Sequence, residues 1–177
     1  LRNFMEGHRE SDEGDWDLSK VGNQARELQN KPFGIFGFGR IGQLVAERLK
    51  PFNVTIQHYD PINQKDNENS KFVEFEELVK TSDAITIHAP LTPSTDNLFN
   101  EDVLNKMKKG SYLVNTARGK IVNTQALVDA VNSGQIQGYA GDVWYPQPAP
   151  ADHPWRTMPS YGMSSLYSRM TLETQTR

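Results

Sequence analysis

The stretch "GIFGFGRIGQLVAERL" at Gly34–Leu49 decides how the rest of this sequence is interpreted. A short apolar run leads into the motif "GFGRIG" at residues 37–42, and an amphipathic helical pattern follows it. The pattern G-x-G-x-x-G between a strand and a helix is typical of dinucleotide-binding proteins, whereas the same glycines alone indicate only a flexible turn. The flanking segments therefore favour a loop that binds a dinucleotide coenzyme.

The residues of this motif each have a physical task. Gly37 permits a tight turn, Gly39 lets a pyrophosphate approach the backbone, and Gly42 lets the helix pack closely on the strand. The free N–H groups at the helix start, around Arg40 and Ile41, can then bind the phosphates. We expect all five residues to belong to the coenzyme site.

An acid stands where the motif requires one. Asp60 ends the next apolar run, 18 residues after Gly42. In this position a carboxylate accepts hydrogen bonds from the adenosine ribose hydroxyls and repels a 2′-phosphate. Pro61 follows it where an arginine would accommodate that phosphate, so the pattern favours NAD over NADP. The alternative interpretation of Asp60 is a solvated acid in a turn.

Short apolar runs alternate with amphipathic segments between Lys31 and Trp144. Helices are expected after the glycine motif, around residues 75–79, from Asn100 to Gly110, and from Asn123 or Thr124 to Gly134. Strands are expected at residues 33–36, 54–59, 72–73, 84–88, 111–115 and 138–143. This alternation predicts right-handed crossovers and a doubly wound parallel sheet, an α/β fold of the Rossmann type.

Composition restricts the possible partners. The chain has 177 residues, which suits one domain, and its net charge of -3 gives no basic face for nucleic acid. It contains no cysteine, so a disulfide framework and a thiolate nucleophile are excluded, and no metal site is implied. No apolar run approaches the roughly 20 residues of a membrane span. We expect a cytoplasmic protein without membrane or nucleic-acid partners.

Two charged residues follow later expected strands. Arg118 and Asp142 both lie where the carboxyl edge of the sheet is expected, and ligands of open α/β sheets bind at that edge. Arginine can bind a carboxylate through two parallel hydrogen bonds, and an acid can meet a carboxamide or a ribose. The alternatives are a solvated surface arginine and an acid that caps a loop.

Five segments in this order resemble the NAD-dependent D-2-hydroxyacid dehydrogenases and, within them, the formate dehydrogenases: "GFGRIG", "HAPLTPST", "LVNTARGK", "GYAGDVW" and "PQPAPADHPWRTMP". The resemblance extends to Pro159. It implies that Arg118 binds formate and that Asp142 holds the nicotinamide carboxamide. It also implies a homodimer. The further residues that it assigns to the NAD cleft are Pro90, Thr92, Ser94, Thr116 and Ser168.

Gln147 stands between two prolines, where the general pattern of the superfamily has a glutamate that supports a catalytic histidine. Oxidation of a hydroxy acid removes a hydride and a proton, so it requires a general base. Formate loses only a hydride and leaves as carbon dioxide. A neutral amide can orient a partner without repelling an anion, so Gln147 favours formate. The alternative is a glutamine that caps a proline-rich turn.

The resemblance weakens after Pro159. Leu166 occupies the position of the family's catalytic histidine, and Arg169 stands where a glycine is expected. The chain's own histidines do not replace the missing one; they are His8, His58, His88 and His153. We expect NAD binding with negligible turnover for the isolated chain.

Three interpretations remain open. The chain is the coenzyme part of a formate dehydrogenase, part of a reductase for a 2-keto acid such as glyoxylate, or an inactive NAD-binding module. In each case we expect residues 1–30 to form a helix end and a connecting loop near the dimer contact. Residues 31–159 would form the NAD-binding domain, and residues 160–177 a divergent tail. The separate substrate domain of the family is expected to be largely missing.

Overall fold

Seven parallel strands form the centre of the fold, in agreement with the predicted doubly wound α/β class. The computed structural model describes residues 4–14, 16–17, 22 and 25–169. The strand order is β3-β2-β1-β4-β5-β6-β7. The strands are β1 Pro32–Phe36, β2 Thr55–Tyr59, β3 Lys71–Phe72, β4 Ala84–Ile87, β5 Ser111–Asn115, β6 Ile136–Gly141 and β7 Tyr161–Met163.

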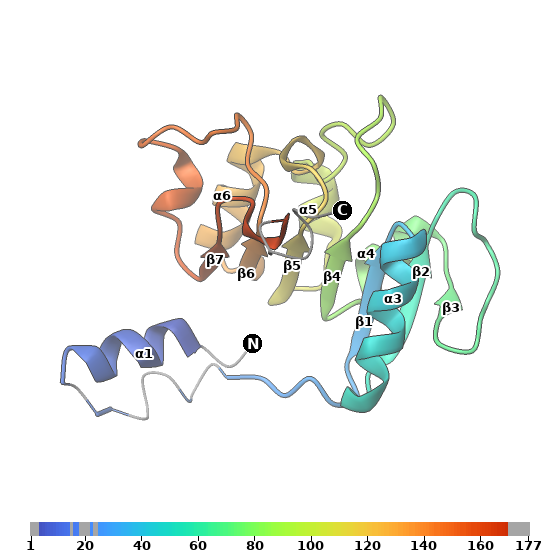
Figure 1. Ribbon diagram of the computed structural model, residues 1–177, viewed down its shortest axis with the longest axis horizontal. Coiled ribbons are helices and arrows are strands. Elements are labelled where there is room, and N and C mark those ends of the chain that lie inside the picture. The colour runs from blue at the N-terminus through green and yellow to red at the C-terminus, as the bar shows by residue number, and fades with distance from the viewer. Residues whose placement is uncertain (1–3, 15, 18–21, 23–24, 170–177) are drawn as a thin grey trace.

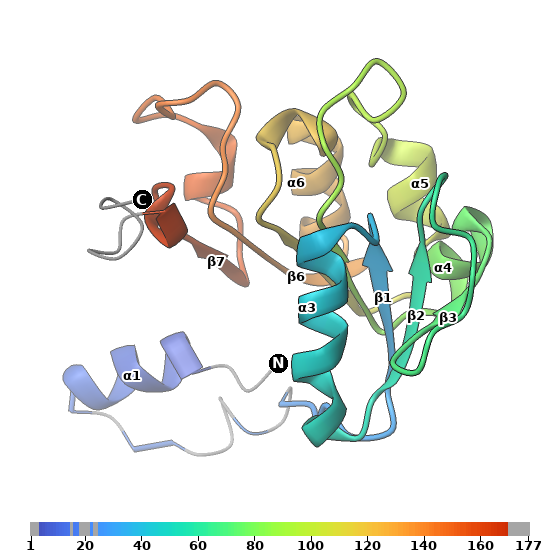
Figure 2. The same cartoon turned by 45° about the vertical axis from the view of Figure 1, so that its right-hand side comes forward.

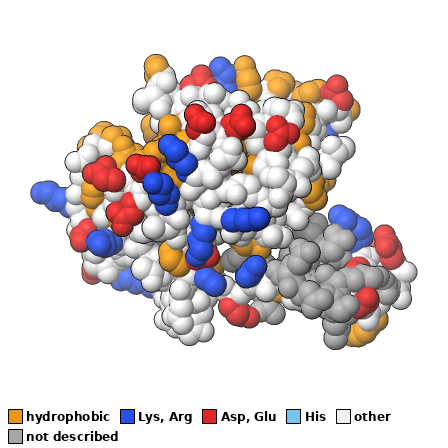
Figure 3. Space-filling model, turned by 180° about the vertical axis from the view of Figure 1, so that it is seen from behind, with side chains coloured by type: hydrophobic (Ala, Val, Ile, Leu, Met, Phe, Trp, Pro, Cys, Tyr) orange, Lys and Arg blue, Asp and Glu red, His pale blue; other side chains and the backbone are white. Residues whose placement is uncertain are grey.

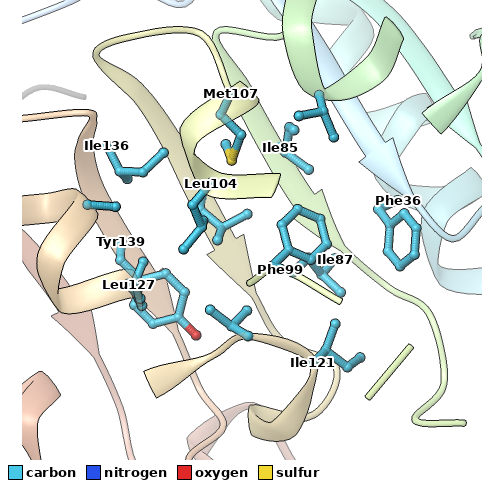
Figure 4. Packing of buried hydrophobic residues seen from close by; sticks show 14 of the residues in the cluster. Phe36, Ile85, Ile87, Phe99, Leu104, Met107, Ile121, Leu127, Ile136 and Tyr139 are labelled. Atoms are coloured by element: carbon cyan, nitrogen blue, oxygen red, sulfur yellow. The ribbon is translucent and has the colours of Figure 1, made fainter. Parts of the chain in front are cut away.

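Helices cover the sheet on both faces (Figures 1 and 2). They are α3 Arg40–Leu49, α4 Phe75–Thr81, α5 Glu101–Lys106 and α6 Thr124–Asn132. Side chains alternate between the two faces of a strand, so Ile35 packs with α3 while the adjacent Phe36 packs with the other helices. The larger core lies between the sheet and α4, α5 and α6. Figure 4 shows it: Phe99 lies beside Ile87 of β4, and Leu127 lies beside Tyr139 of β6.

The order of strands reverses at β1. From β1 the chain moves outward to β2 and β3, returns to β4 on the other side of β1, and continues outward to β7. The carboxyl ends of β1 and β4 therefore mark the reversal point, which is where open α/β sheets bind ligands. The sheet thus places the glycine motif at the predicted binding edge.

Two details differ from the sequence-based expectation. The strand expected at residues 138–143 is β6 Ile136–Gly141, and a register shift lies at Ser111/Tyr112 where it pairs with β5. β7 was not expected at all. It pairs with β6 beyond Pro159, so the sheet continues into the segment interpreted as a divergent tail. Residues 170–177 of that tail lie outside the described residues.

The amino-terminal segment contains α1 Phe4–Asp12, which lies apart from the sheet (Figures 1 and 2). A connection follows this helix and leads to β1, as far as these residues are described, and the boundary expected at residue 30 stays a prediction. Within the described part of the chain, every helix is too short or too polar to cross a lipid bilayer.

Candidate active site

Gly37 follows β1 at the point where the strand order reverses. Its backbone has a φ of +92°, a conformation that side-chain-bearing residues rarely adopt. A Cβ atom at this position would lie 2.5 Å from the backbone nitrogen of Ala89, which follows β4. Gly37 therefore makes both the turn and the close approach of two loops possible, as the motif predicts.

The other two glycines of the motif have opposite surroundings. A Cβ on Gly42 would overlap the carbonyl oxygen of Gly37, so this glycine allows α3 to pack on β1. A Cβ on Gly39 would meet no atom within 4 Å. Gly39 is also the N-cap of α3 and provides no side-chain cap. The first N–H groups of α3, around Arg40 and Ile41, thus face open space in which phosphate oxygens can bind.

Asp60 follows β2 and its carboxylate binds the glycine loop. One oxygen accepts a hydrogen bond from the Phe38 N–H at 2.7 Å, and the other accepts from Ile62 and Asn63 at 2.8 and 3.0 Å. Burial raises the pKa of Asp60, but the three backbone N–H groups outweigh it and hold the pKa below its ordinary value. A carboxylate has about four acceptor positions, so one remains for a ribose hydroxyl.

Side chains behind the loop hold it in place. The ring of His58 stacks on Phe38 with a centroid distance of 3.7 Å, and its Nδ1 lies 2.8 Å from the Ser70 hydroxyl. The Asn63 side chain donates to the Phe38 carbonyl at 3.1 Å. Burial lowers the pKa of His58, although the Asn63 carbonyl and Asp60 partly raise it. His58 is therefore a packed neutral histidine.

The loop after β4 carries the residues expected to line the cleft. Pro90, Thr92 and Ser94 belong to a turn that bonds to itself: the Thr95 hydroxyl donates to the Pro90 carbonyl at 2.7 Å and accepts from the Thr92 N–H at 2.8 Å. Its base at Ala89 contacts Gly37 closely. The structure thus brings this loop beside the glycine motif.

Arg118 lies in the loop after β5, and the buried Asn115 fixes this loop. The Asn115 side chain donates to the Arg118 carbonyl at 2.9 Å and accepts from the Ala117 N–H at 3.0 Å. Thr116 and Arg118 are left exposed at the carboxyl edge. The Arg118 guanidinium donates to the Ala117 carbonyl at 2.7 Å. Guanidinium has five N–H donors, so most of them remain available to an anion.

Gln147 lies in the loop that packs against the Arg118 loop. A Cβ on Gly119 would overlap the backbone of Trp144 and lie 2.8 Å from the Tyr145 nitrogen, so the two loops are in contact. Gln147 is exposed, and its side-chain oxygen accepts from the Trp144 N–H at 3.3 Å. This contact is the turn-capping interaction considered as the alternative. The amide nitrogen donates no hydrogen bond within the described part of the chain.

Asp142 follows β6 and binds the segment after β7. Its carboxylate accepts from the Ser164 and Ser168 hydroxyls, both at 2.5 Å, and from the Tyr167 and Ser168 N–H groups at 2.6 and 2.9 Å. Burial alone would raise the pKa of Asp142, but these donors lower it to about 2. All four acceptor positions are used by the chain, which favours the loop-capping interpretation. Contact with a nicotinamide carboxamide stays a prediction.

The segment after β7 holds Leu166 at the carboxyl edge of the sheet. Its N–H donates to the Asp142 carbonyl at 3.0 Å, and its φ is +60°, in the left-handed region. Its hydrocarbon side chain has no acid–base chemistry. Elsewhere, Nδ1 of the buried His153 accepts from the Trp155 N–H and its Nε2 bonds the Tyr145 carbonyl, so it supports the proline-rich loop.

A family model described as "D-isomer specific 2-hydroxyacid dehydrogenase, NAD binding domain" matches residues 1–165. The chain belongs to this family. The NAD-binding assignment and the resemblance drawn from the five segments are thereby confirmed. The chain spans about half the length of the curated relatives it matches.

Relatives of this dehydrogenase domain include two named formate dehydrogenases. The mitochondrial formate dehydrogenase of Solanum tuberosum is 44% identical over all of this chain and 48% of its own length. The formate dehydrogenase of Candida boidinii is 43% identical over all of this chain and 52% of its own length. A solved structure of NAD-dependent formate dehydrogenase from Staphylococcus aureus, in complex with NAD, is 75% identical with a TM-score of 0.96. That alignment covers 99% of this chain and 54% of the other.

Several positions that shape the site in this dehydrogenase domain were not predicted. Asn115 lies inside "LVNTARGK", and an asparagine directly after a buried strand is a signal for a fixed loop. Gly119 directly follows Arg118, and a glycine beside a functional arginine is a signal that could have marked this position as part of the site. Asn63, Ser164 and the Phe38–His58 stack gave no comparable signal, because their partners are distant in the sequence or depend on the fold.

Proposed function

We propose that this chain is the coenzyme domain of an NAD-dependent formate dehydrogenase. The reaction would transfer a hydride from formate to NAD⁺ and release carbon dioxide and NADH. The observation that carries the proposal is the contact between the Arg118 and Gln147 loops, which follow β5 and β6 at the same carboxyl edge as the glycine motif after β1. The likeness to the Staphylococcus aureus enzyme, at 75% identity, supports it.

Arg118 would bind the formate carboxylate and stabilise it by fixed charge. Its exposed guanidinium retains free donors, and Asn115 holds the backbone that carries it. Gln147 would add a neutral donor, because its amide nitrogen has no acceptor in the described chain while its oxygen is bound to Trp144. These groups would hold the formate C–H against the nicotinamide ring, which is a proximity effect.

No proton leaves formate in this step, so the site needs no general base. A glutamate in place of Gln147 would add a negative charge beside an anionic substrate, and two unit charges about 4 Å apart repel by about 4 kcal/mol near a protein surface. The neutral amide avoids that repulsion. This argument separates formate oxidation from the oxidation of a 2-hydroxy acid.

Leu166 favours a second candidate, an NAD-binding module without catalysis. The segment that carries it is fixed by four hydrogen bonds to the Asp142 carboxylate and one from Leu166 to the Asp142 carbonyl, so a hydrocarbon side chain is held where the family has a histidine. Such a module would retain the glycine loop and Asp60 and bind the coenzyme without turnover.

The proposal includes a cytoplasmic homodimer. Phe4 on α1 is 76% exposed, and α1 lies apart from the sheet, an arrangement that suits a contact between subunits. Sedimentation velocity of the protein, compared with a Phe4→Ser variant, measures the association directly.

The test of the function is an assay of NADH formation from formate by the full-length protein that carries this chain. We expect turnover in the unaltered protein and a loss of about 10²–10³-fold in kcat/KM for Arg118→Ala, because a fixed charge on the substrate is removed. NAD binding should be unchanged. The control is Arg48→Ala, an exposed arginine on α3 whose guanidinium donates to the Leu44 carbonyl of its own helix.

The other outcomes identify the alternatives. Reduction of glyoxylate without oxidation of formate would make the protein a 2-keto acid reductase. Tight NAD binding without either reaction would identify the protein as the inactive module. It would also explain why a leucine, Leu166, stands at the position of the family's catalytic histidine.

A further inference from the structure

The peptide unit between Phe38 and Gly39 lies in the middle of the glycine motif, and two side-chain amides bind its carbonyl oxygen. Gln43, in the first turn of α3, donates to the Phe38 carbonyl at 3.1 Å. Asn63, in the turn after β2, donates to the same oxygen at 3.1 Å. A carbonyl oxygen has two lone pairs, so both of its acceptor positions are used. Two separate elements therefore fix the direction of this carbonyl.

The groups on either side of this peptide unit are also fixed. The Phe38 N–H donates to the Asp60 carboxylate at 2.7 Å, and the buried Phe38 ring stacks on His58. The backbone N–H of Gln43 donates to the Gly39 carbonyl at 3.0 Å and closes the first turn of α3. Gln43 thus binds two successive carbonyls, one through its side chain and one through its backbone.

The two bound carbonyls determine the direction of two N–H groups. A trans peptide unit is planar, so its N–H points opposite to its C=O. The N–H groups of Gly39 and Arg40 share peptide units with these carbonyls, so both point away from Gln43. The Gly39 N–H has no acceptor among the described residues, and a Cβ on Gly39 would meet no atom within 4 Å. Both donors are therefore directed at open space that a pyrophosphate can occupy.

We propose that Gln43 and Asn63 are positioning residues of the coenzyme site. Their amides hold the Phe38–Gly39 peptide unit in the orientation that binds a pyrophosphate oxygen before the coenzyme arrives. Without them the Phe38 carbonyl would turn toward water part of the time, and the apparent affinity falls with the fraction of molecules in the binding orientation. The inference concerns coenzyme binding alone, so it does not depend on which substrate the protein oxidises or on whether it has turnover.

ADP-ribose and adenosine separate this role from a general loss of structure. Both ligands carry the ribose that Asp60 is expected to bind, whereas only ADP-ribose carries the pyrophosphate. Titration calorimetry of the full-length protein that carries this chain measures ADP-ribose directly, and adenosine is measured by competition with it. Gln43→Met keeps the length and the helix propensity of the side chain but removes its donor. Asn63→Ala removes the other amide.

We expect each variant to bind ADP-ribose about fivefold more weakly, which is the effect of one net hydrogen bond, and the double variant to lose more than either. Adenosine should bind all variants equally well. The matched control is Gln64→Ala, which removes an amide that donates to the Pro61 carbonyl at 3.2 Å in the same turn as Asn63. This control should bind both ligands as the unaltered protein does.

Exposed cations on another face of the molecule also attract phosphates. Figure 3 shows the side opposite to that of Figure 1, where Lys and Arg side chains gather on the lower part, next to the residues drawn in grey. The titrations are therefore made at about 0.15 M salt, where the Debye length is about 8 Å and exposed charges are largely screened.

Four results would overturn the assignment. An unaltered protein that does not bind ADP-ribose would remove the site itself. Unchanged ADP-ribose affinity in the double variant would mean that the peptide unit keeps its orientation without the two amides. An equal loss of adenosine affinity would indicate a general disturbance of the loop. An equal effect of Gln64→Ala would mean that the Phe38 carbonyl has no special importance.

Discussion

At the carboxyl edge of the sheet, the acid that follows β2 keeps an acceptor position open, whereas the acid that follows β6 uses all of its acceptor positions within the chain. Gly39 faces empty space and Asp60 keeps one acceptor position. Asp142 is saturated by donors from residues 164–168. The difference teaches that the acid of the coenzyme half is left able to accept a hydrogen bond from a ligand, while the acid of the other half serves to hold the segment after β7.

The largest expected effect comes from the glycine at the strand reversal. Gly37→Val would place a branched side chain at a positive φ and against Ala89, so we expect a loss of about 4 kcal/mol in unfolding free energy. Urea denaturation measures it. Gly39→Ala is the matched control: its Cβ has open space, so stability should change by less than about 1 kcal/mol while NAD binding weakens. Equal stability losses in both would remove the contrast between the two glycines.

In the half of the edge built by β5 and β6, a substitution of Asp142 tests the internal contacts most directly. Its pKa in the folded protein, about 2, lies below the ordinary 3.8, so the ionised carboxylate stabilises the fold above the ordinary value. That contribution, about 2 kcal/mol, is lost as pH falls toward 2. Asp142→Asn should lower the unfolding free energy by a similar amount at pH 7 and by progressively less in acid.

The control for this change is Asp152→Asn, a substitution of an exposed acid in the proline-rich loop. It should leave the free energy of unfolding unchanged at every pH. A pH-independent loss in Asp142→Asn would mean that the carboxylate charge does not hold the segment after β7.

The smallest effect concerns coenzyme choice. Asp60→Ala removes the acceptor for a ribose hydroxyl and the charge that repels a 2′-phosphate, so NAD should bind about tenfold more weakly and the preference over NADP should shrink. Fluorescence titration with both coenzymes measures the ratio. Glu68→Ala, a largely exposed acid, serves as the comparison, and an unchanged ratio in Asp60→Ala would contradict the ribose assignment.

The sequence was sufficient where one local pattern carries its own physical reason. The turn at Gly37 and the close packing at Gly42 could be predicted because both require the absence of a side chain, while the approach of a pyrophosphate to Gly39 stays a prediction. Asp60 could be placed because the carboxyl ends of adjacent parallel strands meet at one edge.

Elsewhere the deciding interactions are long-range. The partners of Asp142 lie 22 to 26 residues later, so nothing near it revealed that its oxygens are filled. β7 consists of three residues with little burial, and only backbone pairing with β6 makes it a strand. The register shift beside Tyr112 displaced β6 from its expected bounds, because periodicity does not record an irregular pairing.

The two outermost strands of the sheet have a consequence for solubility. β3 contains two residues and β7 three, so each outer border offers only a few unsatisfied N–H and C=O groups to a neighbouring molecule. Long flat borders are templates on which sheets of separate molecules join and aggregate. Because its outermost strands are this short, the sheet resists edge-to-edge aggregation without any proline or inward charge on these strands.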